Sequence, residues 1–270
     1  MKKERIDVLL VKQGLFSSRE QAKRAVMAGE ILGKNEERLD KPGMKIDPAI
    51  KLHFKGSKMP YVSRGGFKLA KALKAFHISV VGQIVLDIGA STGGFTDVML
   101  QNGAKLSYAL DVGTNQLAWK LRQDPRVIVM EQTNFRYSKP ADFTAGQPTL
   151  ATIDVSFISL RLILPKLHTI LPLNGSVIAL IKPQFEAGRQ KVGKHGIVHD
   201  PKVHQEVLQQ IISFAAAHEY DVCGLDFSPI KGGEGNIEFL IYLKAVDAPG
   251  KIDPQINIDQ VLRAAQAALL

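Results

Sequence analysis

The chain has 270 residues and a net charge of +9; 45% of its residues are hydrophobic and 23% are charged. This composition is that of an ordinary soluble globular protein, long enough for one large domain and a small one. No apolar run approaches the roughly 18 residues of a membrane span, and the charged N-terminus lacks the apolar core of a secretory signal. The single cysteine, Cys223, excludes an internal disulfide framework and predicts a cytoplasmic protein.

The positive charge is concentrated near the N-terminus. Residues 1–74 contain 18 basic and 8 acidic side chains, whereas residues 75–270 contain 17 basic and 18 acidic ones. A basic segment in front of a near-neutral body favours an attachment that binds a polyanion, since phosphate neutralisation supplies most of the non-specific affinity for nucleic acids. A solvated, lysine-rich surface would give the same count, so charge alone does not decide.

The first sixty residues predict two short helices and a turn-rich β segment. Apolar residues at helical spacing indicate a helix over 4–13, which Gly14 ends. Ser17 and Glu20 form a capping box for a second helix, which ends at Gly29 and carries basic side chains. The residues that follow read as short strands with an evident turn.

This arrangement resembles the small RNA-binding module first named for a ribosomal small-subunit protein and also found on pseudouridine synthases and tyrosyl-tRNA synthetases. In that module the basic face of the second helix meets the RNA backbone. The resemblance implies an RNA-binding domain with its linker over residues 1–60. The RNA contacts that it implies are Arg19, Lys23, Arg24, Lys34 and, at the entry to the next domain, Arg64.

A glycine-rich motif organises the rest of the chain. An apolar strand over 84–87 is followed by Gly89, Gly93 and Gly94 and then by a helical segment. Glycine tolerates positive φ and leaves room for a ligand, while the new helix points free N–H groups at the turn. The spacing does not fit the dinucleotide fingerprint G-x-G-x-x-G, and a turn of this kind can also be a plain connection.

The next strand supports a ligand-binding interpretation of this turn. Residues 106–110 form an apolar run that ends at Asp111. A carboxylate at the tip of the neighbouring strand suits the two hydroxyls of a ribose, because one acid accepts both hydrogen bonds. The sequence therefore predicts an adenosine-bearing ligand.

Strands and helices alternate through the second part of the chain. Further strands are expected over residues 127–130, 150–154, 176–181, 222–227 and 238–243. Helices are expected over residues 67–76, 114–121, 158–171 and 201–220. This alternation predicts an α/β fold with a doubly wound parallel sheet that binds ligands at the carboxyl ends of its strands.

Four details of this part are more specific. Trp119 is available for packing, and Pro165 either interrupts its helix or starts it anew. Residues 184–199 form a glycine-rich basic loop that is expected over the site. The tail over 247–270 carries a helix that is either docked or available to a partner, with one face made of Val261, Ala264, Ala265 and Ala268.

The last two strands would form an antiparallel pair beside the parallel ones. This resembles the seven-stranded sheet of S-adenosylmethionine-dependent methyltransferases, and we expect such a domain over residues 61–246. Topology alone does not give function. The chemistry has to come from particular side chains.

Four charged residues are expected at the crevice: Lys68, Asp154, Lys182 and Glu238. Singly, each has a plain structural explanation, such as a turn cap or a surface charge. Together they resemble the Lys-Asp-Lys-Glu set of the FtsJ-like ribose 2′-O-methyltransferases. The segments YVSRGGFKL, DIGASTGGFTD, TIDVSFISL, IKPQFEAGR and EGNIEF, behind an RNA-binding module, look like the TlyA family of "hemolysin-type" ribosomal RNA 2′-O-methyltransferases.

The resemblance covers about residues 1–244 and implies S-adenosyl-L-methionine as cofactor, ribosomal RNA or ribosomal subunits as partner, and a cytidine ribose as target. It also implies the catalytic set just named. The implied cofactor-binding residues are Asp87, Gly89, Ala90, Ser91, Gly93, Phe95, Asp111, Val112, Asn134 and Asp154.

The chemistry can be stated from the residues. A ribose hydroxyl is nearly unionised at neutral pH, so Lys182 beside that oxygen would stabilise developing alkoxide character. Asp154 would orient Lys182, while Lys68 and Glu238 would complete an alternating charge cluster. We expect no metal, because the sequence offers no His/Cys cluster to hold one.

Three alternatives stay open at this point. Base methylation is weaker, because Cys223 lies within an expected strand and the position after residue 154 reads Val-Ser-Phe rather than the Pro-Pro-aromatic turn of amino-group methyltransferases. A membrane-lytic protein is suggested only by the family's historical name. An RNA-binding chaperone that has lost methyltransferase activity would keep the same fold.

Overall fold

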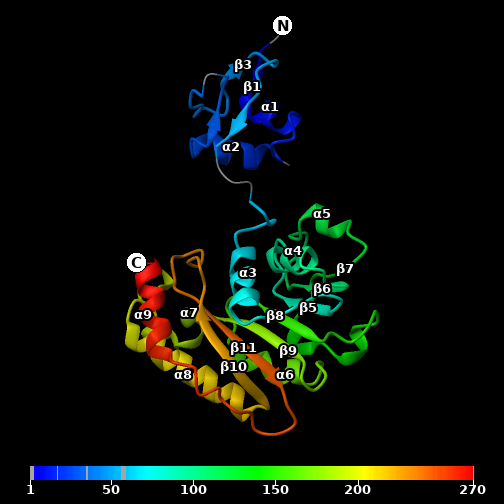
Figure 1. The fold of residues 1–270 in the computed structure, drawn as a ribbon, viewed down its shortest axis with the longest axis vertical. Helices are drawn as coiled ribbons and strands as arrows, with labels where there is room; N and C mark the ends of the chain where they lie inside the picture. The colour runs from blue at the N-terminus through cyan, green and yellow to red at the C-terminus, as the bar shows by residue number, and fades with distance from the viewer. Residues whose placement is uncertain (1–2, 17, 35, 56–58, 270) are drawn as a thin grey trace. The chain divides into compact units, whose positions relative to one another are not determined.

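The computed structural model describes residues 3–16, 18–34, 36–55 and 59–269. The chain divides into two compact units, Met1–Pro60 and Tyr61–Leu270. Each unit has a hydrophobic core of its own. Figure 1 shows the elements of each unit in chain order.

The first unit contains two helices and two small antiparallel strand pairs. Its elements are β1 (Glu4–Arg5), α1 (Ile6–Lys12), α2 (Arg19–Met27), β2 (Ile31–Leu32), β3 (Lys45–Ile46) and β4 (His53–Phe54). Strand β1 pairs with β3, and β2 pairs with β4. Both helices bury their apolar faces in one core that includes Ile6, Leu10, Ala22 and Val26. The predicted pair of helices with a small β segment is confirmed.

The second helix of this unit begins one residue later than expected. The hydroxyl of Ser18 accepts a hydrogen bond from the Gln21 N–H at 3.3 Å, so Ser18 is the N-cap of α2. A hydroxyl at this position satisfies one of the free N–H groups of the first turn. Ser17, which was predicted to form the capping box, lies outside the described residues.

A buried carboxylate ties the start of α2 to α1. The side chain of Asp7 is fully buried and accepts hydrogen bonds from Arg5 at 2.9 and 3.0 Å and from Arg19 at 3.1 Å. The hydrogen bonds from Arg5, and to a smaller extent the interaction with Arg19, lower the pKa of Asp7 to about 2, although burial acts in the opposite direction. Arg19 therefore forms an ion pair within the unit, which reduces the positive charge that it offers to RNA.

The second unit is built on a seven-stranded sheet with the order β10-β11-β9-β8-β5-β6-β7. Its strands are β5 (Ile84–Ile88), β6 (Leu106–Leu110), β7 (Val127–Met130), β8 (Leu150–Ile153), β9 (Ser176–Ile181), β10 (Tyr220–Phe227) and β11 (Phe239–Ala245). Strands β5 to β9 run parallel, whereas β11 is antiparallel to both β9 and β10. The predicted doubly wound sheet of a methyltransferase is confirmed.

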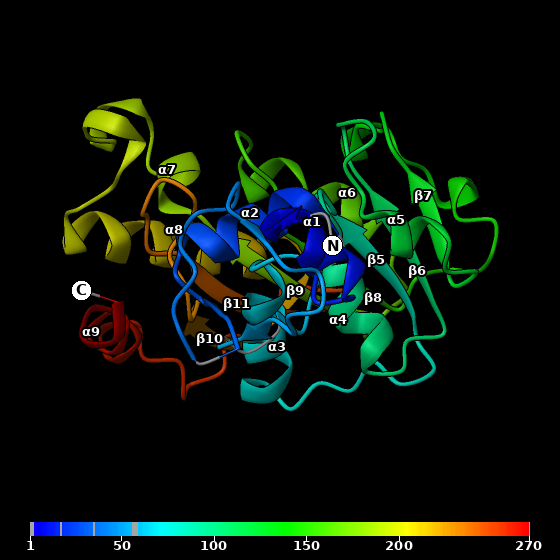
Figure 2. The ribbon, with the colours of Figure 1, turned by 90° about the horizontal axis from the view of Figure 1, so that it is seen from above.

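Helices cover both faces of this sheet, and the strands alternate between two cores. Helices α3 (Gly66–Ala75) and α4 (Gly94–Gln101) pack on the face that carries Val85 and Ile178. Helices α6 (Leu164–His168), α8 (Pro201–Ala217) and α9 (Ile258–Leu269) pack on the face of Leu86 and Val177. Neighbouring residues thus serve opposite faces, as the two-residue period of a strand requires. Figure 2 shows the sheet from above, with α3 and α8 on different sides of it.

The expected helix over 114–121 is wrong in extent, because only Trp119–Arg122 (α5) is helical. The carboxylate of Glu131 accepts hydrogen bonds from the N–H groups of residues 115–117, so that these groups hold a loop. The expectation that Trp119 packs is also wrong, since 70% of this residue is exposed. Helix α6 begins around Pro165, which confirms that proline starts a new helix there.

The tail helix α9 is docked on α8 and β10. Leu262 and Ala265 are buried in the main core, and Gln205 of α8 donates a hydrogen bond to Asp259 at 2.9 Å. The predicted apolar face was partly wrong, because Ala264 and Ala268 are exposed. Among the described residues, no helix is long and apolar enough to cross a membrane.

The buried carboxylate of Asp7 gives a first testable prediction. Its folded pKa of about 2 lies below the unfolded value near 4, so its contribution to stability is present above about pH 4 and lost as the pH falls through 2. We expect Asp7→Asn to lower the stability of the first unit by about 1 kcal/mol at pH 7, a figure reduced for the exposed arginines. Amide exchange of Leu9 and Leu10 in the full chain measures this.

Asp40→Asn is the matched control, because Asp40 is exposed in the same unit. If the amides of Leu9 and Leu10 exchange at the same rate in both variants at pH 7, the stabilising role of the Asp7 ion pairs is contradicted.

Candidate active site

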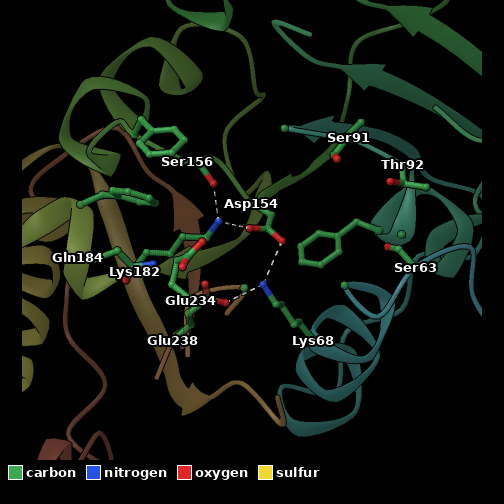
Figure 3. A pocket seen from close by; sticks show the side chains of 18 residues that line it. Ser63, Lys68, Ser91, Thr92, Asp154, Ser156, Lys182, Gln184, Glu234 and Glu238 are labelled. Atoms are coloured by element: carbon green, nitrogen blue, oxygen red, sulfur yellow. Dashed lines mark hydrogen bonds and ion pairs between the residues drawn. The ribbon is translucent and has the colours of Figure 1, made fainter. Parts of the chain in front are cut away.

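A cavity of about 340 Å³ opens at the carboxyl ends of β5, β8 and β9 (Figure 3). Its floor is the glycine turn after β5, and its walls come from α3, the segments after β8 and β9, and the segment before β11. The residues that line it are Ser63, Gly65, Lys68, Gly89, Ala90, Ser91, Thr92, Gly94, Phe95, Asp154, Ser156, Phe157, Lys182, Gln184, Phe185, Gly233, Glu234 and Glu238.

The glycine turn has the backbone geometry that a bound cofactor needs. Gly89 has a φ of +86°, and a Cβ there would lie 2.6 Å from the carbonyl oxygen of Asp154. Gly93 has a φ of +93° and is the N-cap of α4, whose first N–H groups face the turn. Only glycine adopts such a conformation readily next to another backbone. The turn therefore offers a cradle lined by backbone, which fits S-adenosyl-L-methionine.

Asp87 lies beneath this turn and does not line the cavity. It is fully buried and accepts hydrogen bonds from the Thr96 N–H at 2.9 Å, the Thr96 hydroxyl at 2.7 Å and the Thr152 hydroxyl at 3.0 Å. Burial raises its pKa to about 6, although these hydrogen bonds act in the opposite direction. Asp87 thus ties α4 and β8 to β5, and its contact with the cofactor stays a prediction.

Asp111 follows β6, as predicted, and supports the same turn. Its two oxygens accept hydrogen bonds from the Ser91 and Gly113 N–H groups, both at 2.7 Å. A carboxylate has about four acceptor positions, so both oxygens keep capacity for ribose hydroxyls. Val112 is exposed, and Asn134 accepts a hydrogen bond from the Arg136 N–H. Neither of these two lines the cavity, so their cofactor contacts stay predictions.

The structure brings the four predicted charged residues into one chain of ion pairs. Lys68 Nζ lies 2.6 Å from Glu238 Oε2 and 3.4 Å from Asp154 Oδ2, and Lys182 Nζ lies 2.6 Å from Asp154 Oδ1. Figure 3 shows these side chains converging from α3 and from three strand ends. Strand β11 is antiparallel to β9, with Phe239 opposite Ile181, which places the residue before β11 beside the residue after β9.

This cluster is shielded from solvent, which sets its protonation. Lys68 and Lys182 are each 7% exposed and Glu238 is 2% exposed. Burial lowers the pKa of Lys68, but the carboxylates of Asp154 and Glu238 outweigh it, and the pKa is raised overall. For Asp154 the effect of burial is likewise outweighed by the two lysines, and its pKa is lowered. Lys68 and Asp154 therefore hold opposite charges at neutral pH.

Three further residues at the cavity were not predicted from the sequence. The Ser156 hydroxyl accepts a hydrogen bond from Lys182 Nζ at 3.2 Å. Phe157 is 91% exposed with a φ of +65°, and its ring centroid lies 5.0 Å from that of Phe185. The only sequence signal was their presence in the segments TIDVSFISL and IKPQFEAGR, because periodicity does not identify an aromatic ring that stays in solvent.

The predicted RNA contacts fall in different units. Arg24 and Lys34 are exposed, Lys23 is partly exposed, and Arg19 is half-exposed while paired with Asp7. Arg64 is exposed but belongs to the second unit. Within the described residues, no group of three or more His, Cys, Asp or Glu is placed to hold a metal ion.

Comparison with known proteins identifies the family. The FtsJ-like methyltransferase family matches residues 61–245, and the S4 domain matches residues 4–49. The chain is 62% identical to "Putative rRNA methyltransferase YqxC" of Bacillus subtilis, over 99% of this chain and 94% of that protein. It is 40% identical to "16S/23S rRNA (cytidine-2′-O)-methyltransferase TlyA" of Mycobacterium tuberculosis, over 90% of each.

A solved structure agrees over the whole chain. The "Putative hemolysin from Streptococcus thermophilus" is 60% identical, with a TM-score of 0.78, over 99% of this chain and 97% of that one. The chain therefore belongs to the TlyA/hemolysin family of FtsJ-like methyltransferases with an S4 domain, as its sequence predicted. Its fold is that of enzymes that use S-adenosyl-L-methionine.

The glycine cradle gives a second prediction. Gly89→Ala combines a positive φ with a Cβ that would lie 2.6 Å from the Asp154 carbonyl oxygen, so the turn has to shift. We expect cofactor affinity to fall about tenfold or more and the free energy of unfolding to drop by about 1–3 kcal/mol. Calorimetric titration with S-adenosyl-L-methionine and thermal unfolding measure the two effects.

Gly82→Ala is the control that separates the strain of a positive φ from the clash between a new Cβ and a neighbouring backbone. Gly82 also has a positive φ, of +71°, but no atom lies within 4 Å of a Cβ built there. Equal losses of cofactor affinity in the two variants would contradict the assignment of residues 89–94 as the cradle.

Proposed function

We propose that this protein transfers a methyl group from S-adenosyl-L-methionine to the 2′-oxygen of a cytidine ribose in ribosomal RNA. The observation that carries the proposal is the buried chain of ion pairs from Glu238 through Lys68 and Asp154 to Lys182, beside the glycine cradle. A cluster of alternating fixed charges suits the activation of a hydroxyl group. The choice of target is supported by relatives that are named as ribosomal RNA and cytidine-2′-O methyltransferases.

Lys182 is the residue that we assign to the reacting oxygen. An ammonium group has three donor hydrogens, and in this structure two of them are directed at Asp154 and Ser156. The third is left for the ribose hydroxyl at the cavity. As the hydroxyl proton leaves to solvent, the fixed positive charge of Lys182 stabilises the negative charge that develops on the oxygen.

The other three charged residues hold the ammonium group of Lys182 in place. Asp154 fixes the direction of the ammonium group, and its lowered pKa keeps it ionised. Lys68 and Glu238 extend the alternation and prevent Asp154 from turning away. The bound cofactor supplies the electrophilic methyl group, and the residues that would hold it are Gly89, Ala90, Ser91 and Phe95 in the cavity floor.

The mouth of the cavity suits a nucleotide that is presented singly. The exposed ring of Phe157 and the ring of Phe185 lie side by side next to Lys182. Exposed aromatic rings of this kind stack on bases that have left a helical stack. A base held there would bring its own ribose towards the lysine.

The first unit is proposed to supply affinity for the RNA backbone. It matches the S4 domain, and its second helix carries Lys23 and Arg24 at the surface. We place this activity in the cytoplasm, in keeping with a single cysteine, Cys223, and a ribosomal RNA substrate.

A third prediction tests the reaction itself. Lys182→Met removes the charge beside the reacting oxygen while keeping most of the side-chain volume, so cofactor affinity should stay within about twofold while methyl transfer falls at least about a hundredfold. The assay uses labelled S-adenosyl-L-methionine with ribosomal subunits and with free ribosomal RNA, followed by nucleoside mass spectrometry. The expected product is 2′-O-methylcytidine.

Lys74→Met is the control, because Lys74 is an exposed lysine on α3 and should leave turnover unchanged. A label on a base would favour base methylation. Tight RNA binding without any transfer would favour an inactive chaperone, and leakage of liposomes with purified protein would favour the lytic alternative.

A fourth prediction concerns the RNA-binding helix. Lys23→Glu with Arg24→Glu should weaken RNA binding and make the salt dependence shallower by about one unit of log–log slope for each lost phosphate contact. Arg19 is left intact here, because its reversal would also break the buried pair with Asp7. Binding is measured as a function of salt concentration.

Lys105→Glu with Lys139→Glu makes the same change of net charge at exposed positions of the second unit. If both double variants lose affinity equally, the effect is one of total charge, and the second helix is not a specific contact.

A further inference from the structure

The buried side chain of Asn236 holds a loop that the proposed mechanism does not use. Asn236 is 1% exposed, and its Oδ1 accepts a hydrogen bond from the Val198 N–H at 3.0 Å. Its Nδ2 donates to the carbonyl oxygen of Gly196 at 2.9 Å. One amide group therefore satisfies a donor and an acceptor of the same short stretch of backbone, which fixes the orientation of the amide as well.

The same stretch is held from a second side by His204 of α8. Its Nε2 lies 3.0 Å from the carbonyl oxygen of Val198, and because a carbonyl only accepts, Nε2 carries the hydrogen. His204 is 3% exposed and its ring packs edge-on against Phe239. Burial lowers the pKa of His204, which keeps the ring neutral. The backbone of Val198 is thus held between Asn236, in the segment before β11, and His204 of α8.

Asn236 also shapes the wall of the cavity. Its backbone carbonyl accepts a hydrogen bond from the Gly232 N–H at 2.9 Å and closes the turn that carries Gly233 and Glu234, two lining residues. A Cβ on Gly232 would lie 2.5 Å from Glu238 Oε1, so this turn lies against the catalytic carboxylate. Glu238 follows Asn236 by two residues. The side chain and the backbone of Asn236 therefore join the loop and the wall.

The loop that ends at this clamp is basic and exposed. Arg189, Lys194 and His195 are exposed, whereas Lys191 forms an ion pair with Glu206 of α8. The backbone has positive φ at Gly188 (+78°), His195 (+66°) and Gly196 (+74°), and the Gly193 N–H donates to the Ile197 carbonyl oxygen. Basic side chains on a tightly turned backbone that is anchored at one end suit the phosphates of an RNA strand.

We propose that Asn236 is a positioning residue that latches the basic loop 188–198 to the cavity wall, so that RNA phosphates bound by this loop set the geometry around Glu238. The proposal rests on the proposed function in taking RNA as the substrate. It assigns the loop a phosphate-binding surface distinct from the S4 domain. It also explains why a neutral polar side chain is buried so near a cluster of full charges.

The hydrogen bonds of Asn236 couple the order of loop 188–198 to that of the cavity wall over 232–236. An unlatched loop would lose the defined positions of its basic side chains, and phosphate contacts that hold a flexible loop have to offset its ordering entropy. The turn over 232–236 would at the same time lose its tie to the loop. Asn236 should therefore affect RNA binding and turnover together, while the glycine cradle for the cofactor stays intact.

The test compares three kinds of variant in the full-length protein. Asn236→Ala removes the latch, and His204→Phe removes the second hydrogen bond but keeps a ring beside Phe239. His204→Gln restores a donor and should rescue the Phe variant's losses. Gln190→Ala, an exposed polar residue of the same loop, is the control.

Four readouts are taken on each variant: amide exchange over 188–199, the salt dependence of ribosomal RNA binding, methyl transfer at saturating RNA, and cofactor affinity. Asn236→Ala should speed exchange at Val198 about tenfold or more, because a buried hydrogen bond is lost. It should also make the salt slope shallower by about one to two units and lower methyl transfer at least about tenfold. Cofactor affinity should stay within about twofold of the unsubstituted value.

A double-mutant cycle shows whether the latch acts through the basic loop. Arg189→Ala with Lys194→Ala should reduce the salt slope as much as Asn236→Ala does, and the combination should lose little more. Additive losses, or a loss of methyl transfer with unchanged exchange at Val198 and an unchanged salt slope, would overturn the proposal. If Asn236→Ala no longer binds the cofactor, this variant is misfolded. The two His204 variants then test whether the latch positions the loop.

Failure of the proposed function looks different. If the wild-type protein methylates no ribose, the proposed function is contradicted. Amide exchange over 188–199 and the salt dependence of RNA binding do not require turnover, so they still test the latch.

Discussion

The arrangement of the active site depends on the cost of burying charge. Asp154 lies between Lys68 and Lys182, and Glu238 closes the row, so each buried charge has an opposite charge within 3.4 Å. An isolated buried charge costs several kcal/mol, and removing one partner leaves the others uncompensated. The sheet order β11-β9-β8 makes the row possible, because it brings the residues that flank these three strands to one edge. The fold and the chemistry are thus linked through charge compensation.

The strand pattern predicted the sheet and the glycine turn, while the resemblance to the FtsJ-like enzymes singled out the four charged residues as a set. Buried strands such as β5 and β9 read as continuous apolar runs, and parallel strands end at a common edge. The strand pattern therefore places Asp154 and Lys182 at this edge of the sheet, whereas the positions of Lys68 and Glu238 beside them depend on tertiary contacts. Residues 114–121 could not be predicted in this way, because Glu131, far along the chain, captures the N–H groups that a helix would use. The exposure of Phe157 and the pairing of Arg19 with Asp7 likewise depend on tertiary contacts.

The charge near the N-terminus likewise shows that tertiary contacts cannot be predicted from local sequence. A count of basic residues treats Arg19 and Lys23 as equal, yet Arg19 lies 3.1 Å from a carboxylate that is fully buried. Its first energetic role is to compensate Asp7 and to join α1 with α2. The basic surface available to RNA is consequently smaller than the composition suggests, and Lys23 and Arg24 are the cleaner probes of that surface.

Several segments that follow or precede strands of the sheet are held by a polar side chain that bonds to backbone. Asp111 holds the turn at Ser91, Glu131 holds the loop after β6, and Glu186 accepts hydrogen bonds from the Leu160 N–H and the Ser159 hydroxyl. Asn236 does the same for Val198, but it is uncharged. A further carboxylate beside Glu238 would raise the negative charge next to Lys68 and weaken the alternation on which Lys182 depends. The amide provides both a donor and an acceptor there without altering the charge of the cluster, which is the property that a latch beside this site requires.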